Sequence, residues 1–578
     1  MCRTSCQRDP LASLCLPALA LSLVLSATGC GSTANSGTSG SPTGPATPSS
    51  AGTASITTWH YDNNRSGLNP NETTLTPATV GAQSFGKLFS YLTDGYAYAE
   101  PLLISNVSIA GATHNVLYVA TENDSVYAFD ADNYGSGAPL WHVSLLQSGE
   151  TPLSGAIQPV QGVTSTPVID AKTNTLYVVS AQTSTANGHT FRLHALDIAT
   201  GAEKFGGPVV LQASLPGTGD GGTTVSLTTS CVQRAALLLA NSNIYIGFGD
   251  CVRGWLLAYS ASTLSQVAVF TSSPNLNGEN TNASAGGIWM GGGGPVADSA
   301  GNVYVVTGNG PWDGQTAYGD SILKFGPTLH LEDYFTPYDF QYMDCNDDDL
   351  GSGGLLLIPG TTELLAGGKT STMYLVNSAN MGHEQANDAG ATQTLVWGQG
   401  LSNGATYSAT CNDSAGTETA NVTSYEIFGT SAFYNNYIYL GVTPEEPASP
   451  GGVREFQYSG TLTPGAYTTP NIQLGTRGTT PFISSNGSSG GILWMIDTGS
   501  PLQGSGGAAP TSAILRAYDA DMFPNELYNS ATNSADAAGY GIKFTSPIVA
   551  NGKVYISTGH DLTTATNPQG EIDVYGLK

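Results

Sequence analysis

Short apolar stretches and polar turns alternate in one recurring order along most of the chain. Each unit has an apolar strand, a turn, a second strand around a tyrosine, a polar turn and a further strand. Eight copies follow one another, at spacings of roughly 50 to 75 residues. They span residues 99–132, 164–201, 234–260, 293–325, 353–377, 427–459, 481–521 and 545–576. Long runs with helical periodicity are absent from the sequence, so the pattern predicts an all-β chain.

A single copy of this unit cannot bury both of its faces. Copies stacked radially cover one another and leave few exposed strand edges. The repeat therefore predicts an eight-bladed β-propeller of four-stranded antiparallel blades over residues 56–578. Because the spacing is irregular, seven blades is the alternative. We expect residues 59–69 and 85–91, which precede the first copy, to complete the outer strand of the last blade and close the ring.

Composition narrows the possible partners. Charged residues make up only 10% of the 578 residues and 73 are glycine, as expected for many strands joined by tight turns. The formal net charge is −26, and no basic stripe could neutralise phosphate, so we expect no nucleic-acid partner. The balance fits a protein of an extracytoplasmic compartment.

Residues 1–30 have the features of a targeting segment. Arg3 and Arg8 give a weak basic region, and residues 11–27 are apolar but too short for a stable membrane span. The small residues before Cys30 resemble a bacterial lipobox, which implies a lipid on Cys30. Ordinary signal cleavage a few residues earlier is the alternative.

The residues after Cys30 predict where the chain is held. Gly31 stands where an aspartate would favour the inner membrane, which implies retention at the outer membrane. Residues 31–55 are rich in Ser, Thr, Gly and Pro and predict a flexible tether. We therefore expect a bacterial cell-envelope lipoprotein, facing the periplasm or the exterior, with the lipid anchor as its membrane contact. Protein partners at the envelope are compatible with this location.

Four cysteines remain after the targeting segment and Cys30. An even number in an exported chain favours disulfides. Pairing of sequence neighbours gives Cys231 with Cys251 and Cys345 with Cys411. No spacing of the CxxC or CxxCH kind is present, so we expect no haem built into this chain.

The ends of the repeats carry a recognisable pattern. The second copy ends in Ala-Leu-Asp-Ile-Ala-Thr-Gly at 195–201, and the first has Ala-Phe-Asp at 128–130 with Trp141 following. The pattern resembles the repeat of the pyrroloquinoline quinone (PQQ) enzyme superfamily, in which an Ala–Trp contact docks one blade on the next. The resemblance covers residues 56–578 and implies the propeller fold. It leaves activity open, because the same blades serve dehydrogenases and non-catalytic assembly lipoproteins.

Three positions resemble the methanol-dehydrogenase type of quinoprotein more closely. The strand Tyr-Val-Val-Thr-Gly-Asn ending at Asn309 resembles the strand whose Asn binds calcium in those enzymes. Asp349, before an apolar strand, stands in the place of their catalytic base. Lys369, before a Tyr-containing strand, stands where a basic residue contacts the quinone. The resemblance thus implies Asn309 as a metal ligand, Asp349 as catalytic and Lys369 as cofactor-binding.

Two further positions match less closely. The segment Val-Arg-Gly-Trp-Leu-Leu-Ala-Tyr at 252–259 resembles one that follows a calcium-binding Glu, and Asp250 is the nearest acid. Trp289 lies two or three positions from the Trp that forms the floor of the cofactor pocket. The adjacent cysteines that cover the quinone in that family are missing. The implied roles are metal binding for Asp250 and cofactor binding for Trp289.

The implied chemistry is coherent, and each residue also has a structural alternative. Calcium prefers carboxylate and amide oxygens and would polarise a quinone carbonyl. Asp349 would take an alcohol proton, and Lys369 would stabilise negative charge on the reduced quinone. Alternatively, Asn309 is a turn residue, Asp347 to Asp349 form a solvated turn or a structural calcium loop, Lys369 makes only an ion pair, and Trp289 only packs.

The register of the repeat places the polar candidates together. Asp349 lies just before a first strand, where the loops open on one face of the ring. Ends of second strands open on the same face. They carry Glu122, Asp250, Asn309, Lys369 and His560. We therefore expect all six side chains around one mouth of the central channel.

Two functions of different classes follow. The first is a PQQ- and calcium-dependent oxidation of an alcohol or sugar at this mouth. The second is a non-catalytic binding or scaffold propeller, similar in architecture to the outer-membrane assembly lipoprotein. The missing adjacent cysteines and the displaced Trp289 favour the second. A carbohydrate-binding or -cleaving surface, suggested by the 28 tyrosines, is a third interpretation that this count does not decide.

Overall fold

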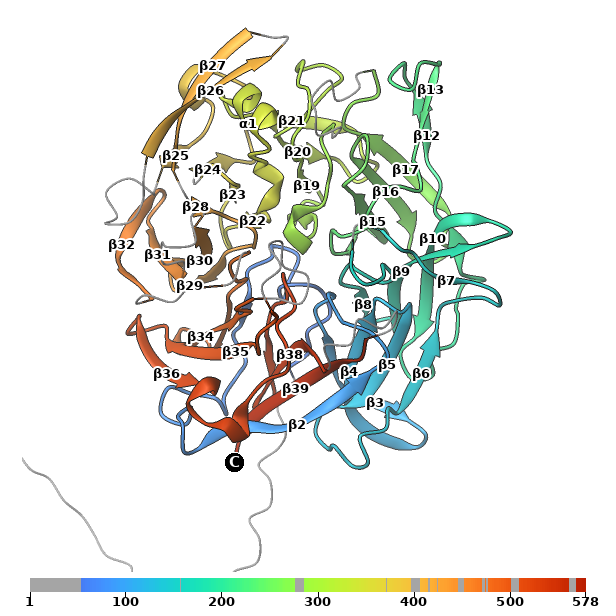
Figure 1. Cartoon of the computed structure of the whole chain (residues 1–578), viewed down its shortest axis with the longest axis vertical. Helices are drawn as coiled ribbons and strands as arrows, with labels where there is room; N and C mark the ends of the chain where they lie inside the picture. The colour runs from blue at the N-terminus through green and yellow to red at the C-terminus, as the bar shows by residue number, and fades with distance from the viewer. Residues whose placement is uncertain are drawn as a thin grey trace, which may run out of the picture. The chain divides into compact units, whose positions relative to one another are not determined.

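The computed structural model describes residues 54–155, 157–275, 285–370, 372–396, 406–413, 416–423, 425–444, 452–469, 474, 477–500, 509–560 and 568–578. For residues 406–413, 416–423, 444 and 466–468 the backbone alone is described. Eight antiparallel blades of four strands form a ring (Figure 1), which confirms the predicted eight-bladed β-propeller. Among the described residues, no helix is both long and apolar enough to cross a membrane.

The first four blades follow the order of the repeats. Blade 1 contains β3 (Leu102–Ile109), β4 (Ala112–Thr121), β5 (Ser125–Asp130) and β6 (Trp141–Ser144). Blade 2 contains β8 (Val168–Asp170), β9 (Thr175–Ser184), β10 (Gly188–Asp197) and β11 (Val209–Val210), with β7 (Thr151–Pro152) added to β9. Blade 3 contains β14 (Leu238–Ala240), β15 (Asn243–Phe248), β16 (Trp255–Ser260) and β17 (Gln266–Thr271). Blade 4 contains β18 (Val296–Ala297), β19 (Val303–Val306), β20 (Ile322–Phe325) and β21 (Leu331–Phe335).

The remaining blades repeat this order. Blade 5 contains β22 (Leu356–Leu357), β23 (Glu363–Gly367), β24 (Thr372–Asn377) and β25 (Gln393–Val396). Blade 6 contains β29 (Ala432–Tyr434), β30 (Tyr437–Pro444), β31 (Gly452–Tyr458) and β32 (Leu462–Thr468), with β28 (Tyr425–Glu426) paired to β30. Blade 7 contains β33 (Phe482–Asn486), β34 (Ser489–Asp497), β35 (Ile514–Asp519) and β36 (Asn525–Asn529). Blade 8 contains β37 (Ile548–Ala550), β38 (Lys553–Gly559), β39 (Gly570–Leu577) and β2 (Phe85–Thr93).

Smaller elements decorate the ring. Two additional hairpins are β12 (Ser214–Pro216) with β13 (Thr224–Ser226), and β26 (Thr406–Asp413) with β27 (Gly416–Thr423). The described residues contain one short α-helix, α1 (Phe340–Asn346). The 3-10 turns are Met290–Gly292, Leu350–Ser352, Ala386–Asp388, Ser530–Thr532 and Ser534–Asp536.

Of the two N-terminal segments expected in the last blade, only one is found there. β2 pairs antiparallel with β39 and completes blade 8, as predicted for residues 85–91. Residues 59–69 do not extend this blade. Their end, β1 (Leu68–Asn69), instead pairs parallel with β33 of blade 7. The polar sequence of this segment explains the difference, because its main-chain and side-chain groups bond to many blades rather than to one sheet edge.

The segment 56–69 crosses the middle of the ring, in blue in Figure 1, and we refer to it as the hub. It forms hydrogen bonds to the first strand of every blade. In blade order, the pairs are Ile56 with Leu103, Thr57 with Ile169, Asn63 with Leu239, Asn63 with Ala297, Asn64 with Leu357, Ser66 with Phe433, Gly67 with Ile483, and Asn69 with Val549. The hub therefore ties the eight blades to one another at the axis.

Arg65 anchors the hub from inside the protein. The side chain is fully buried. Its Nε donates to the carbonyl of Pro295 at 3.0 Å, and its two terminal nitrogens donate to Thr58 Oγ1 at 2.7 Å, to the carbonyl of Trp59 at 3.0 Å and to that of Leu237 at 3.3 Å. Burial lowers the pKa of Arg65 to about 10, so it still carries its charge at neutral pH.

The recurring tyrosine of the second strands joins neighbouring blades. In at least five blades its hydroxyl donates to a main-chain carbonyl of the following blade. The pairs are Tyr118 with Ile198, Tyr177 with Ala261, Tyr245 with Pro327, Tyr439 with Ala520, and Tyr555 with Ala131. The repeat keeps tyrosine because its ring fills the blade interface while its hydroxyl is satisfied there.

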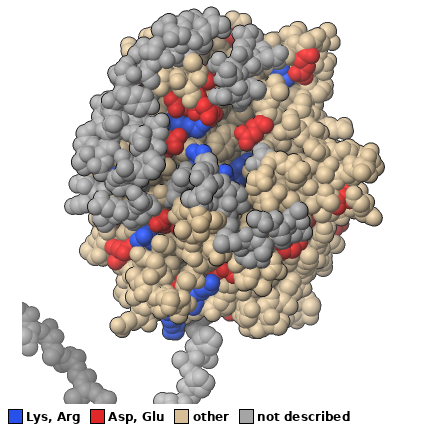
Figure 2. Space-filling model, in the orientation of Figure 1, with Lys and Arg blue, Asp and Glu red and all other residues tan. Residues whose placement is uncertain are grey.

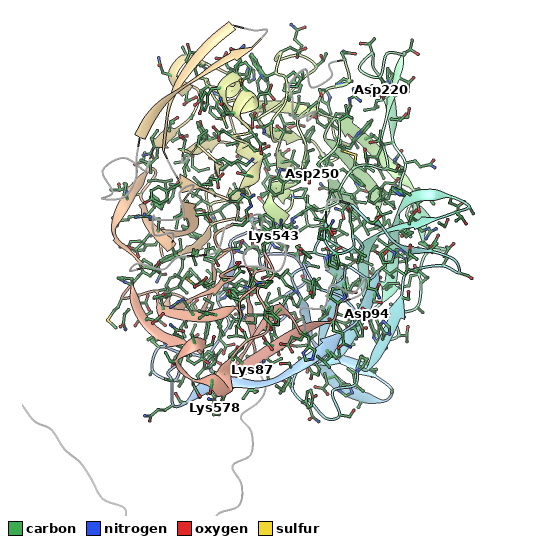
Figure 3. The ribbon with its side chains drawn as sticks, in the orientation of Figure 1. Lys87, Asp94, Asp220, Asp250, Lys543 and Lys578 are labelled. Atoms are coloured by element: carbon green, nitrogen blue, oxygen red, sulfur yellow. A yellow bond between two sulfur atoms is a disulfide. The ribbon has the colours of Figure 1, made fainter. Side chains whose placement is uncertain are left out.

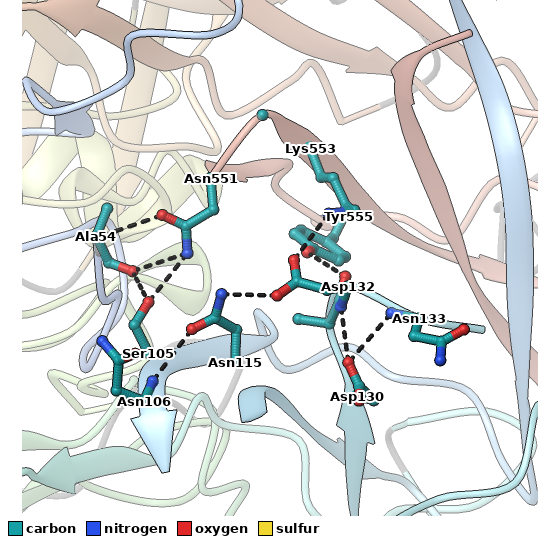
Figure 4. Close-up of polar contacts among 12 residues, drawn as sticks. Ala54, Ser105, Asn106, Asn115, Asp130, Asp132, Asn133, Asn551, Lys553 and Tyr555 are labelled. Atoms are coloured by element: carbon teal, nitrogen blue, oxygen red, sulfur yellow. Dashed lines mark hydrogen bonds and ion pairs between the residues drawn. The ribbon is translucent and has the colours of Figure 1, made fainter. Parts of the chain in front are cut away.

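Polar side chains close the seam between blade 8 and blade 1 (Figure 4). The side-chain amide of Asn551 donates to the carbonyl of Ala54 at 3.2 Å and to Ser105 Oγ at 3.0 Å. Its oxygen accepts from the Ala54 nitrogen at 3.1 Å. Beside them, Lys553 forms an ion pair with Asp132 at 2.9 Å. The ring is thus held at its closing point by side chains as well as by β2.

We predict that Arg65→Met lowers the free energy of unfolding by at least about 3 kcal/mol, because buried carbonyls lose their donors. Urea unfolding followed by tryptophan fluorescence measures this. Lys172→Met, at an exposed turn of blade 2, is the control and should stay within about 0.5 kcal/mol of the unchanged protein. A small effect for Arg65→Met would show that the hub contributes little to stability.

A second prediction concerns Glu100, which accepts a hydrogen bond from the His60 nitrogen of the hub at 2.9 Å. Burial raises the pKa of Glu100 to about 8. The folded protein therefore keeps a proton that the unfolded chain releases near the ordinary carboxyl pKa, and stability falls as pH rises toward 8. Glu100→Gln should remove up to about 1.4 kcal/mol per pH unit of this fall.

Urea unfolding at pH 5, 6, 7 and 8 tests the Glu100 prediction. The difference between the unchanged protein and Glu100→Gln should change steadily across this series. Glu332→Gln, at an exposed position, is the control and should give a curve parallel to that of the unchanged protein. Parallel curves for Glu100→Gln would contradict the prediction.

Candidate functional site

The candidate site forms where blades 3, 4 and 5 meet at the mouth. A short strip before β18 lies between the loops of blades 3 and 4. The nitrogen of Gly286 donates to the carbonyl of Asn309 at 2.7 Å, and that of Ile288 donates to the carbonyl of Phe248 at 2.9 Å. This strip brings the loop of Asp250, which follows β15, beside the loop of Asn309, which follows β19.

Asp349 lies between blades 4 and 5. One oxygen, Oδ1, accepts from the Asn309 nitrogen at 2.9 Å, and the other, Oδ2, pairs with Lys369 Nζ at 2.6 Å. Gly308 and Gly368 flank it so closely that a Cβ at either position would collide with Asp349. Glycine is therefore required at both positions for this aspartate to enter the interface.

Lys369 links two acidic residues. Its Nζ lies 3.2 Å from Asp347 Oδ1 and donates to the carbonyl of Asp347 at 2.6 Å. Asp347 caps α1 in a left-handed conformation, with φ of 62°, and also accepts from Asn309 Nδ2 at 2.8 Å. The predicted residues Asn309, Asp349 and Lys369 therefore form one connected cluster.

Burial and charge set the protonation behaviour of this cluster. Burial raises the pKa of Asp349, and Lys369 opposes the rise. Burial alone would lower the pKa of Lys369, yet the two aspartates raise it above its ordinary value. The pKa of Asp250 is raised by burial and by the negative charge of Asp349. These mutual effects show that the three carboxylates share one electrostatic environment.

Two side chains at the site offer oxygens that have no hydrogen-bond partner in the described part of the protein. Asn309 Oδ1 is buried and unpartnered. The Asp250 carboxylate makes no hydrogen bond or ion pair among the described residues, and its backbone is left-handed, with φ of 49°. An unpartnered oxygen as buried as that of Asn309 is costly unless a ligand or water satisfies it, whereas Asp250 is open to solvent at the pocket.

The cluster lines a pocket of about 800 Å³ at the middle of the ring, which we name the central pocket. Figure 2 shows acidic and basic residues gathered around this hollow, and Figure 3 shows Asp250 and Lys543 near the middle of the ring. One group of lining residues, which we call the acidic group, consists of three aspartates, a lysine and an asparagine: Asp250, Asp347, Asp349, Lys369 and Asn309. A basic and aromatic group contains Arg234, Phe428, Arg477, Lys543 and Phe544. Trp289 also lines the pocket, and its ring meets that of Phe544 edge-on at 6.1 Å.

The basic and aromatic group was missed from the sequence, although the repeat register contains the signal. Arg234 begins the third copy, and Lys543 and Phe544 directly precede the eighth. Phe428 lies at the start of the sixth, and Arg477 lies shortly before the seventh. Asp349 is expected at the mouth because it lies just before a first strand. The same argument applies to these five residues.

Two expected mouth residues do not line the central pocket. Glu122 is buried, and its Oε2 accepts from the Gly162 nitrogen at 2.7 Å and from Thr164 Oγ1 at 2.9 Å. His560 pairs with Glu571 of β39 at 3.1 Å. Its partner lies on the neighbouring strand rather than in the pocket.

The cysteines give one clear outcome. Cys231 and Cys251 form the predicted disulfide, and Cys251 lines the central pocket next to Asp250. The family's adjacent pair is missing, yet a disulfide between separated cysteines lies at this wall. Cys345 lies in α1, whereas the side chain of Cys411 and the whole of Cys30 lie outside the described residues. The pairing of Cys345 with Cys411 and the lipidation of Cys30 stay predictions.

Two side chains of the pocket offer oxygens of the kind that calcium binds. The amide of Asn309 and the carboxylate of Asp250 offer hard oxygens of the type calcium prefers. No described group of three or more His, Cys, Asp or Glu side chains is arranged to hold a metal, so a bound quinone and water would supply most of the six to eight oxygens. A volume of about 800 Å³ is that of a ligand site.

Comparison with solved structures identifies the fold. No family model and no curated protein matches the sequence. The chain is similar to the quinohemoprotein alcohol dehydrogenase of Comamonas testosteroni, with a TM-score of 0.56 and 14% identity over 90% of this chain and 80% of that one. A quinohemoprotein alcohol dehydrogenase from Pseudomonas putida HK5 gives 0.51 and 14%, covering 91% and 80%.

A europium-containing methanol dehydrogenase gives a TM-score of 0.57 and 14% identity, over 90% of this chain and 98% of that one. These likenesses confirm the resemblance to the PQQ-type propeller at the level of fold. Identity this low assigns no role to any single residue.

We predict that Lys369→Met lowers the free energy of unfolding by about 3 to 5 kcal/mol, because it leaves the buried Asp349 without its positive partner. The double variant Lys369→Met/Asp349→Asn should recover much of this loss, since no unpaired charge remains. Urea unfolding of both variants measures the difference. An equal loss in the two variants would show that the ion pair itself is unimportant.

Proposed function

We propose that this chain, which has the fold of the PQQ-type alcohol dehydrogenases, is a PQQ- and calcium-dependent dehydrogenase that oxidises a small alcohol or sugar. One observation carries the proposal. The central pocket holds the ion-paired Asp349 and Lys369 beside the buried, unpartnered Oδ1 of Asn309 and the exposed carboxylate of Asp250. This is a base, a cation and a hard metal-ligand set within one ligand-sized cavity.

Each group of the pocket has a distinct part in the proposed reaction. When bound, PQQ supplies the electron-accepting carbonyl and calcium polarises it. Asp349 accepts the hydroxyl proton of the alcohol as general base. Lys369 holds the aspartate in place and balances negative charge that develops nearby. Asn309 Oδ1 and Asp250 would hold the metal, and Trp289 would offer an apolar wall to the quinone.

We further propose that the chain is exported and anchored by a lipid on Cys30 at the outer membrane, facing the periplasm or the exterior. The support is the sequence of residues 1–30 and the tether that follows. A tether of this composition would let the propeller stand away from the membrane surface. The lipid would then be the chain's membrane contact, and protein partners at the envelope would have access to the outer loops.

A non-catalytic binding propeller is the second candidate. Its supporting observation is that both oxygens of Asp349 are already engaged, one by Lys369 and one by the Asn309 nitrogen. In that case the cluster would only fasten blade 4 to blade 5. Asp349→Ala and Lys369→Ala would then leave the capture of a partner unchanged.

The two candidates are separated by cofactor binding and activity. Calorimetric titration of the purified full chain with PQQ in the presence of calcium should show binding at micromolar concentrations, and alcohol or sugar should drive dye reduction. Asp349→Asn should keep PQQ binding and lose activity by a factor of about 100 or more, since a positioned base contributes 10² to 10⁴. Asp170→Asn, at the end of β8 in blade 2, should leave both unchanged.

The proposal has a clear negative outcome. Neither PQQ binding nor dye reduction at micromolar cofactor would exclude the dehydrogenase and leave the binding propeller. PQQ binding together with full activity of Asp349→Asn would retain the cofactor and reject Asp349 as its base.

A further inference from the structure

Three cations of the central pocket have almost no negative partner. The chain holds only 17 Lys and Arg against 43 Asp and Glu, so the basic side chains have many possible acidic partners. Nevertheless, Arg234, Arg477 and Lys543 come together from three separate blade entries to line one pocket. This concentration of positive charge in a strongly acidic protein requires an explanation.

Arg234 is the most unusual of the three. Its side chain is buried, yet it makes no hydrogen bond or ion pair in the described part of the protein, and its Nε is enclosed without a partner. Its guanidinium instead lies 4.7 Å from the ring centre of Phe544 and 5.5 Å from that of Tyr98. A buried guanidinium with five donors and no acceptor is rare in a folded protein.

Lys543 and Arg477 are held in the same manner. Lys543 Nζ lies 5.6 Å from the ring centre of Phe544 and has no acidic partner among the described residues. The guanidinium of Arg477 lies 4.5 Å from the ring centre of Phe428. Burial, followed by the positive charges of Arg477 and Arg234, lowers the pKa of Lys543, which shows that these cations repel one another.

Aromatic rings position these cations without neutralising them. A ring attracts a cation through its quadrupole and leaves the full positive charge available to a third group. A carboxylate partner would instead cancel the charge. The arrangement thus fixes three positive groups in place and keeps their charge for a ligand.

The acidic groups nearby do not balance the cluster. Glu426 lies 3.9 Å from Arg477, a long contact for an ion pair. Glu122 acts on Arg234 only at longer range, and its Oε2 is bonded to Gly162 and Thr164. Asp250 is shared between this cluster and the acidic group of the pocket. Net positive charge remains on this side of the central pocket.

We propose that Arg234, Arg477 and Lys543 form an oxyanion-binding subsite, so that the central pocket selects organic ligands that carry a carboxylate or phosphate group. The guanidinium of Arg234 supplies the buried donors, and Lys543 and Arg477 supply charge from the rim. The anion is bound by charge-assisted hydrogen bonds in a partly water-excluded site.

The subsite also restricts the class of substrate that the central pocket would accept. If the proposed dehydrogenase activity holds, on which this step rests, the alcohol to be oxidised belongs to an acid or a phosphate ester rather than to a neutral alcohol. A hydroxy acid or a sugar acid would place its charged end on the three cations and its hydroxyl toward Asp349.

Calorimetry on the full chain, without PQQ or calcium, tests the subsite. The probes are gluconate, its neutral counterpart glucose, and inorganic phosphate. Gluconate should bind at least about tenfold more tightly than glucose, and its affinity should fall with rising salt. Lys543→Met and Arg477→Met, both partly exposed, should each weaken gluconate binding about tenfold without affecting that of glucose. Lys172→Met is the control and should leave all affinities unchanged.

Any one of the following results would overturn the subsite. The first is absence of binding for both gluconate and inorganic phosphate. The second is equal affinity for gluconate and glucose, or gluconate affinities that Lys543→Met and Arg477→Met leave unchanged. The third comes from a parallel titration with PQQ: weaker PQQ binding with unchanged gluconate binding would assign the cations to the cofactor. Because the anion titrations contain no quinone, failure of the dehydrogenase proposal would not affect them.

Discussion

The whole ring depends on one short segment at its axis. A propeller closes only if eight separately folded sheets adopt the same tilt and spacing around a common centre. In this protein the hub, residues 56–69, supplies that reference by a hydrogen bond to the first strand of each blade. Arg65 fixes the hub itself through buried carbonyls on blades 3 and 4. Interior groups of this kind cannot exchange their partners for water without loss of stability.

The consequence for the site is indirect but important. The candidate residues come from blade entries and from loops after second strands, which have little regular structure of their own. They meet at one mouth only because the blades behind them are held in register. Asp349 illustrates this dependence, since it enters the seam between two blades and requires Gly308 and Gly368 to make room. The positions of the site residues are therefore only as well defined as the packing of the blades that carry them.

The sequence was informative wherever one repeat could be compared with another. The spacing of the strands gave eight blades, and the register placed Asp250, Asn309, Asp349 and Lys369 at one mouth. Sequence-based prediction failed for the segments that lie outside the repeat. The prediction that residues 59–69 belong to an outer strand is wrong, because a polar segment that bonds to eight different blades has no periodicity in its sequence. Arg234 was missed for another reason, since a lone arginine at the start of an apolar strand gives no sign that it will lack an acidic partner.

The position of the hub in the chain also has a consequence for how the protein is made. The hub is synthesised before any blade, yet its bond from Asn69 to Val549 joins residues 480 positions apart. Until the last blade has been synthesised and folded, some hydrogen-bonding groups of the hub have no partner in the protein. Folding that depends on contacts this distant is slow and exposes incomplete sheets to aggregation. The segment that makes the finished ring rigid is therefore the one that delays its completion.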